Sequence, residues 1–134
     1  LAQHEYGQAQ VQLQRAMEQQ RESLDADHPD MAGSLTYMSD ALLGLGMIPE
    51  ALESAERALR IRRRTLPPNA PDIAQVLMRV AQARAAAGDT PASTAAWQEA
   101  LEIADRAPDQ RALTVLEVRT RSAAAGASTH SAAR

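Results

Sequence analysis

The side chains that could carry chemistry in this 134-residue chain are few and scattered. The three histidines, His4, His28 and His130, could bind a metal ion or act as bases, but two of them lie near the chain ends. No His-Glu-x-x-His motif, cysteine cluster or glycine-rich phosphate loop accompanies them. We interpret His28 as a structural residue of a turn, and we predict no metal site, no cofactor and no catalytic residue.

An acidic cluster surrounds His28, and it would suggest calcium binding. Asp25, Asp27 and Asp30 lack the twelve-residue ligand spacing and the central glycine of a calcium loop. Acids just before a helix are favoured by the positive end of its dipole, which explains the cluster without a ligand. No catalytic serine or cysteine arrangement can be built from the sequence either, so we predict a protein that is not an enzyme.

An arginine-rich run ends one of the predicted helices, and it contains Arg57, Arg60, Arg62, Arg63 and Arg64 without any acid. Cations are favoured at a helix C-terminus, and arginine stems can cover the edge of a core. A nucleic-acid surface is disfavoured because the whole chain carries a net charge of −3. Two interpretations remain open: a surface that docks an acidic partner, and a solvated helix end. Residues 1–56, in contrast, carry a formal charge of −8.

These residues are positioned by a long internal repeat with a fixed period. The segment 27–32, Asp-His-Pro-Asp-Met-Ala, returns as the segment 69–74, Asn-Ala-Pro-Asp-Ile-Ala, and no insertion separates the copies. Further pairs keep the same spacing, namely Leu35 with Leu77, Gly46 with Gly88, Pro49 with Pro91 and Ala58 with Ala100. A fixed period of this size is typical of stacked repeats that bury their apolar faces against one another.

Each repeat unit has the pattern of two helices. Apolar residues recur three or four positions apart, prolines stand where helices can begin, and glycines stand where they can end. Short turns between such segments are typical of antiparallel helical hairpins. Alanine, the best helix former, fills many apolar positions, whereas the β-branched and aromatic residues of strands are scarce. We predict helices near residues 3–24, 30–45, 49–65, 71–87, 91–106 and 109–125.

The predicted helices form one repeat domain over residues 1–126. It consists of a half-repeat (3–24), two full repeats (27–68 and 69–107) and a terminal helix (108–126), which begins at Pro108-Asp109 after a loop about five residues shorter than its counterpart. We expect residues 127–134 to be a disordered tail. The unpaired terminal helices predict self-association through Leu13, Met17, Leu116 or Val118.

The repeat resembles a known family. A glycine between the helices and alanines at fixed points of the second helix resemble tetratricopeptide repeats, and the 42-residue form opening with Asp27-His28-Pro29-Asp30 resembles the kinesin light chain type. The resemblance covers about residues 5–126 and implies an all-α, right-handed superhelical solenoid of antiparallel helical hairpins, with two full repeats flanked by half-repeats. HEAT-type repeats share the period but lack this combination of glycine and alanine positions.

The resemblance also implies a concave partner-binding surface, lined by the first helices of successive hairpins. The paired asparagines with which the family binds extended peptides are replaced by Thr36-Tyr37 and Met78-Arg79, so different side chains must read a ligand here. Tyr37 and Arg79 are the expected anchors, because these residue types dominate binding hot spots. The predicted surface comprises Thr36, Tyr37, Asp40, Met78, Arg79, Gln82, Leu116 and Thr120.

We therefore expect an interaction module that binds a protein or peptide, within a larger bacterial regulatory or scaffold protein of the cytoplasm. All basic residues are arginine and alanine is abundant, as in proteins coded by GC-rich bacterial genomes. The chain starts without a methionine or a signal sequence, which suggests a segment of a longer chain. The alternatives are a sensor or autoinhibitory arm of a multidomain signalling NTPase or transcription regulator, and a spacer without a ligand. No apolar run is long enough to span a membrane.

Overall fold

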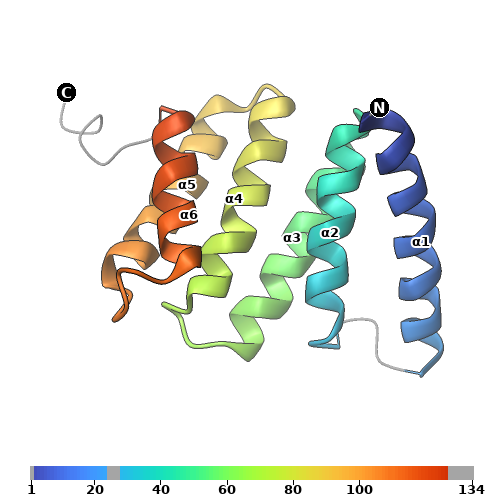
Figure 1. The fold of residues 1–134 in the computed structure, drawn as a ribbon, viewed down its shortest axis with the longest axis horizontal. Coiled ribbons are helices and arrows are strands. Elements are labelled where there is room, and N and C mark those ends of the chain that lie inside the picture. Colours follow the sequence, from blue (N-terminus) through green and yellow to red (C-terminus); the bar gives the residue numbers. More distant parts are fainter. Residues whose placement is uncertain (1, 24–27, 127–134) are drawn as a thin grey trace. The chain divides into compact units, whose positions relative to one another are not determined.

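The fold is all-α over the part of the chain that the computed structural model describes, residues 2–23 and 28–126. These residues form six helices and no strand, as the repeat pattern predicts (Figure 1). The tail predicted at 127–134 lies outside the described residues. The helices are α1 (Ala2–Ser23), α2 (Met31–Gly44), α3 (Ile48–Thr65), α4 (Pro71–Ala86), α5 (Thr90–Arg106) and α6 (Leu113–Ala124).

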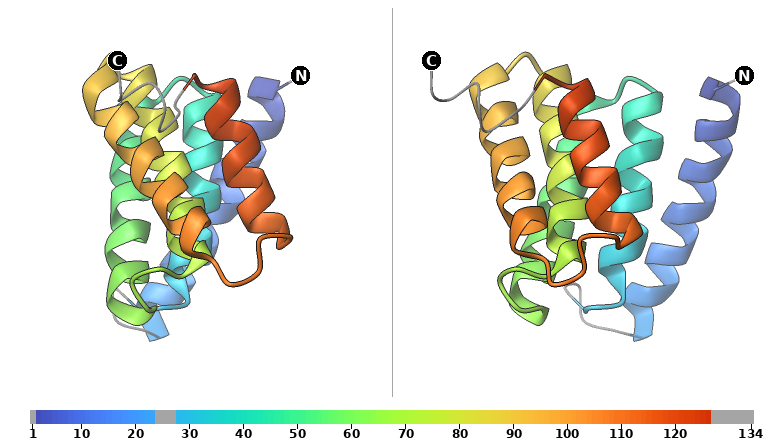
Figure 2. Two further views of the ribbon diagram at one scale, coloured as in Figure 1. Left: turned by 90° about the vertical axis from the view of Figure 1, so that its left-hand side faces the viewer. Right: turned by 60° about the vertical axis from the view of Figure 1, so that its left-hand side comes forward.

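The helices group into two compact units, one formed by Leu1–Thr65 and the other by Leu66–Arg134. In the first unit α2 packs against both α1 and α3, and α2 and α3 form the predicted hairpin. In the second unit α4 and α5 form the equivalent hairpin, and α6 packs against both of its helices (Figure 2). Each unit therefore contains one full hairpin and one further helix.

Glycine ends the first helix of each hairpin, as predicted. Gly46 has a φ of +79°, and its amide donates to the carbonyl of Leu43 at 3.0 Å. The next amide, of Met47, reaches back to the carbonyl of Leu42 at 2.9 Å. These two hydrogen bonds satisfy carbonyls that the helix end leaves without partners, and they require a left-handed residue that glycine adopts without strain. Gly88, with a φ of +86°, closes the second hairpin in the same way.

The helices of each hairpin approach closely through a serine–alanine pair. In the first hairpin the Ser39 hydroxyl, on α2, donates to the carbonyl of Ala51 on α3 at 2.9 Å. In the second the Ser93 hydroxyl, on α5, donates to the carbonyl of Ala81 on α4 at 2.8 Å. The two pairs occupy equivalent positions of the repeat, but the serine has changed helix. The contact is thus kept while its donor and acceptor are exchanged.

Small and large core residues lie where the repeat pattern expects them. Ala58 and Ala100 are completely buried, which leaves no room for a larger side chain. Trp97 on α5 is only 4% exposed, so its side chain belongs to the core.

The start of α6 differs from the prediction. Pro108-Asp109 does not begin a helix; α6 begins at Leu113, and residues 108–112 form a turn. Within this turn the Asp109 carboxylate accepts the amide of Arg111 at 2.9 Å. A proline followed by an acid thus serves a turn here rather than a first helical turn, because hydrogen bonds to the preceding helix compete for the segment.

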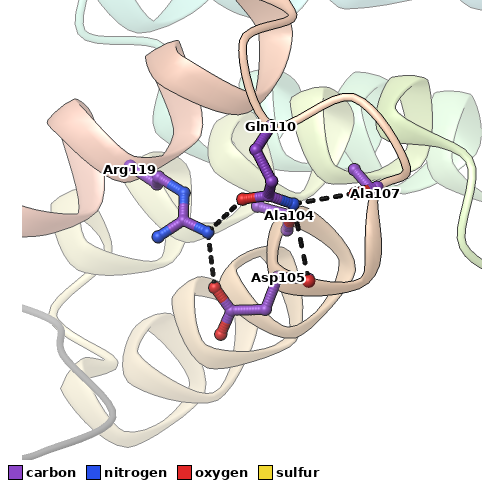
Figure 3. A network of polar contacts seen from close by, with 5 residues as sticks. All are labelled: Ala104, Asp105, Ala107, Gln110 and Arg119. Atoms are coloured by element: carbon purple, nitrogen blue, oxygen red, sulfur yellow. Dashed lines mark hydrogen bonds and ion pairs between the residues drawn. The ribbon is translucent and has the colours of Figure 1, made fainter.

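The side chain of Gln110 supplies those competing hydrogen bonds (Figure 3). Its amide donates to the carbonyls of Ala104 and Ala107 at 2.7 and 2.8 Å, at the C-terminal end of α5. Its side-chain oxygen accepts a hydrogen bond from Arg119 of α6, which also pairs with Asp105 at 2.9 Å. The turn is thereby attached both to the helix before it and to the helix after it.

The later start returns α6 to the register of the repeat. Leu113 stands one full repeat period after Pro71, the first residue of α4, so the prediction of a shortened loop is wrong. Val115 and Val118 are buried at the positions that Ile73 and Val76 occupy in α4. Alignment of α6 with α4 at the same repeat period predicts this register from the sequence alone.

Candidate functional site

The first unit presents part of the predicted partner surface on α2. Tyr37, one of two tyrosines in the chain, is 66% exposed. Thr36 and Asp40, which share this stretch of α2, are half-buried, and the Thr36 hydroxyl donates to the carbonyl of Ala32 at 2.8 Å. Tyr37 therefore offers most of the accessible area of this patch.

The second unit presents another part of the predicted partner surface, on α4. Arg79 is half-buried, and its guanidinium donates to the carbonyl of Gln75 at 3.1 Å, one turn earlier on the same helix. Gln82 is half-buried as well. Met78, predicted to face a groove, has no exposed surface, so that prediction is corrected: its side chain belongs to the core and offers a partner nothing to contact. On α6, Leu116 is 46% exposed and Thr120 is exposed.

The residues predicted to mediate self-association differ in their exposure. Leu116 occupies the repeat position at which Ala32 and Ala74 are buried, yet its own side chain is exposed. Val118 is buried completely against the second unit's hairpin and cannot mediate association, which corrects the prediction. Leu13 is half-buried, and the side chain of Met17 lies outside what the structure describes.

The arginine-rich run forms the C-terminal half of α3. Arg60, Arg63 and Arg64 are exposed, whereas Arg57 and Arg62 are half-buried. Three of these cations occupy the last turn of the helix, where the helix dipole favours them. The Arg57 guanidinium lies 4.0 Å from the sulfur of Met31 and so covers the start of α2. Both interpretations of this run remain compatible with its placement.

His28 lies in a turn. Its Nδ1 accepts a hydrogen bond from the amide of Asp30 at 3.2 Å, and its carbonyl accepts the amide of Met31 at 2.9 Å. Both contacts shape the entry into α2. Among the described residues no group of three or more histidines or acids is arranged to hold a metal ion. No helix within this part of the chain is long and apolar enough to cross a membrane.

A pocket of about 380 Å³ in the first unit was not predicted. It lies between α1 and α3, and residues of α2 also line it. The space is open because, among the described helices, α1 packs against α2 and not against α3. Its lining residues are far apart in the sequence, so no local pattern predicts it. Its lining comprises Gln10, Gln14, Glu18, Leu35, Met38, Leu42, Met47, Glu50, Glu53, Ser54 and Arg57.

Comparison with protein families agrees with this geometry. The family model of the tetratricopeptide repeat matches residues 1–64, which contain α1 and the α2–α3 hairpin. This is a tetratricopeptide repeat protein. The α4–α5 hairpin, outside the matched segment, has the same turn glycine and the same buried alanine at the equivalent positions of the next repeat. No curated protein is similar enough to the chain to count as a match.

Membership of this family indicates the general role of the chain. Tetratricopeptide repeats are interaction modules that bind other proteins and typically carry no catalytic activity. The match is to the tetratricopeptide repeat in general, so the kinesin light chain type and the right-handed superhelix remain predictions.

Proposed function

We propose that this tetratricopeptide repeat protein is a non-catalytic interaction module of a larger bacterial regulatory or scaffold protein, and that it acts in the cytoplasm. It binds a protein or peptide partner through two patches, one on each unit. The single observation that supports this most directly is the exposure of Tyr37 in the middle of a well-packed helix.

A partner that covers Tyr37 gains binding free energy from its side chain. A tyrosine ring brings a large apolar area and a hydroxyl with few rotamers to fix, so its burial stabilises a complex at small entropic cost. Asp40, one turn later on α2, adds an acceptor for the partner's amides or cations. On the second unit, Arg79 and Gln82 offer donors on one face of α4, and Thr120 adds a hydroxyl on α6.

The test is site-specific crosslinking in the native host. A photoreactive phenylalanine replaces Tyr37 in one variant and exposed Glu102 of α5 in the control, and mass spectrometry identifies the crosslinked protein. We expect a discrete partner at position 37 only. Titration of that partner should then show at least a tenfold weaker affinity for Tyr37→Ala, while Val11→Ala, at another exposed apolar residue, binds as before. Equal binding by both variants, with the fold intact, contradicts the proposed site.

A second candidate function has its own observation, the exposed cations at the end of α3. In this alternative the chain is a sensor or autoinhibitory arm, and Arg60, Arg63 and Arg64 dock on an acidic surface of a neighbouring domain in the same protein. Substitution of all three by glutamine in the full-length protein would then raise its basal activity. Unchanged basal activity, with partner binding through Tyr37 retained, favours the interaction module.

A further inference from the structure

The pocket of the first unit has a floor and a rim of different chemistry. Leu35, Met38 and Leu42 of α2 form an apolar floor, and the half-buried Met47 continues it past the end of that helix. The rim is polar on both sides and comes from α1 and α3. Its volume of about 380 Å³ lies within the range of roughly 300–1,000 Å³ that binding pockets occupy in proteins.

The pocket stays open because its first wall is polar. Gln10, Gln14 and Glu18 follow one another at four-residue spacing, so they line one face of α1. Side chains of this kind retain their hydration and do not close over an apolar floor. A weak contact links this wall to the floor, because the Gln10 amide donates to the sulfur of Met47 at 3.9 Å.

The opposite wall gives the pocket its charge. Glu50, Glu53, Ser54 and Arg57 line one face of α3, and with Glu18 they give the rim a formal charge of −2. Glu18, Glu50 and Glu53 are exposed, so a partner reaches their carboxylates without rearrangement of the fold. The two acids of α3 lie toward the Met47 end, whereas Arg57 lies toward Met31 at the start of α2. The charge of the rim is therefore uneven along its length.

We propose that this pocket binds a segment of another protein that carries an apolar side chain next to lysine or arginine. The apolar side chain rests on Met38, Leu42 and Met47, and the cationic group pairs with Glu50 and Glu53. Long basic side chains fit such a place well, because their methylene stems cover apolar surface while their heads meet the carboxylates. Arg57 repels a second cation at the far end, which fixes the direction of the bound segment.

The proposal rests on the proposed interaction function and adds a site, lined by α1, α2 and α3, that is separate from the Tyr37 patch. Three of the acids within residues 1–56, namely Glu18, Glu50 and Glu53, line this pocket. Cationic segments are drawn toward such a surface before contact, so the association rate should fall as salt is added.

The experiment follows the methyl groups of the five methionines by NMR while a synthetic peptide is added. The probe peptide alternates leucine with arginine, and its control carries glutamate in place of every arginine. We expect the probe to shift the Met38 and Met47 signals and to leave Met78, in the second unit, unchanged. The control peptide should shift none of them.

Two variants test the charges. Glu50→Gln with Glu53→Gln should weaken binding of the probe about threefold to tenfold at low salt, since exposed ion pairs contribute modestly. The matched control is Glu99→Gln with Glu102→Gln, which removes two acids at the same spacing from α5 and should leave the affinity unchanged. Circular dichroism of both variants verifies that the helices are retained.

The outcomes separate the two proposals. Probe binding that shifts Met78 rather than Met38 and Met47 overturns the pocket but leaves an interaction module. Equal binding of both peptides, equal effects of the two double variants, or no binding of the probe also overturns the pocket. A partner that crosslinks at position 37 while the probe fails to bind would place recognition on the Tyr37 patch alone.

Discussion

The serine–alanine pairs of the two hairpins have their donor and acceptor helices exchanged. They predict that the serine donor can be moved from one helix of a hairpin to the other without loss of stability. Ser93 is 5% exposed and donates to the Ala81 carbonyl at 2.8 Å, and Ala81 is completely buried. The first hairpin makes the same contact with Ser39 on the opposite helix. The double variant Ala81→Ser with Ser93→Ala therefore gives the second hairpin the arrangement of the first.

The magnitudes follow from what each change removes or adds. Ser93→Ala deletes a buried hydrogen bond but leaves no donor unpaired, so it should cost about 0.5–1.5 kcal/mol. Ala81→Ser alone adds an oxygen beside an existing hydroxyl in a filled site, which should cost about 1–3 kcal/mol by overpacking. The double variant should lie within about 0.5 kcal/mol of the original protein, so the two sites should be coupled by roughly 2 kcal/mol.

The assay is urea denaturation followed by tryptophan fluorescence. Trp97 is the single tryptophan, buried one turn after Ser93 on α5, so its emission reports the unfolding of the second unit. Ser122 of α6 provides a control, because it is also buried but its hydroxyl has no hydrogen-bond partner among the described residues. Ser122→Ala should leave stability unchanged or raise it, since it removes an unsatisfied buried polar group.

Two results would refute this reasoning. Equal losses for Ser93→Ala and Ser122→Ala would mean that the hydrogen bond at Ser93 contributes nothing. A double variant as unstable as the sum of its two single variants would mean that surrounding packing, rather than the pair itself, decides which helix carries the serine.

The remaining predictions concern the core, the turn before α6 and the exposed end of the second unit. Trp97→Ala should lower the free energy of unfolding by about 3–5 kcal/mol, measured by circular dichroism in urea; a loss below half a kcal/mol would contradict the buried position. Ala58→Leu and Ala100→Leu should each cost about 1–3 kcal/mol in the same assay, and tolerance of leucine would show that the helices separate readily there. Gln110→Ala should lower stability by about 1 kcal/mol and speed amide hydrogen exchange in the turn at 108–112, whereas unchanged exchange would count against its role in capping α5. Leu116→Ser should reduce self-association in light scattering at high protein concentration, and a chain that is monomeric throughout would contradict association through this residue.

The sequence by itself determined the repeat, the helices and the places where they end. Apolar spacing, helix-starting prolines and left-handed glycines act over a few residues, so their meaning survives without tertiary context. Gly46 and Gly88 end their helices as predicted, and Ala58 and Ala100, which are equivalent in the repeat, are both completely buried. The period of the repeat also contained the register of α6, because Val115 and Val118 repeat Ile73 and Val76.

Tertiary structure decided the features that depend on a neighbour. Whether Pro108-Asp109 starts a helix depends on Gln110, which instead caps the end of α5 and draws the segment into a turn. Whether Met78 and Val118 are exposed to solvent depends on which other residues pack over them, and the local sequence pattern does not contain that information. The acidic pocket likewise exists only because α1 leaves α3 uncovered, so side chains far apart in the sequence meet at one rim. Hydrogen bonds within a helix are local and readable from sequence, whereas burial and pockets are set by the packing of whole helices.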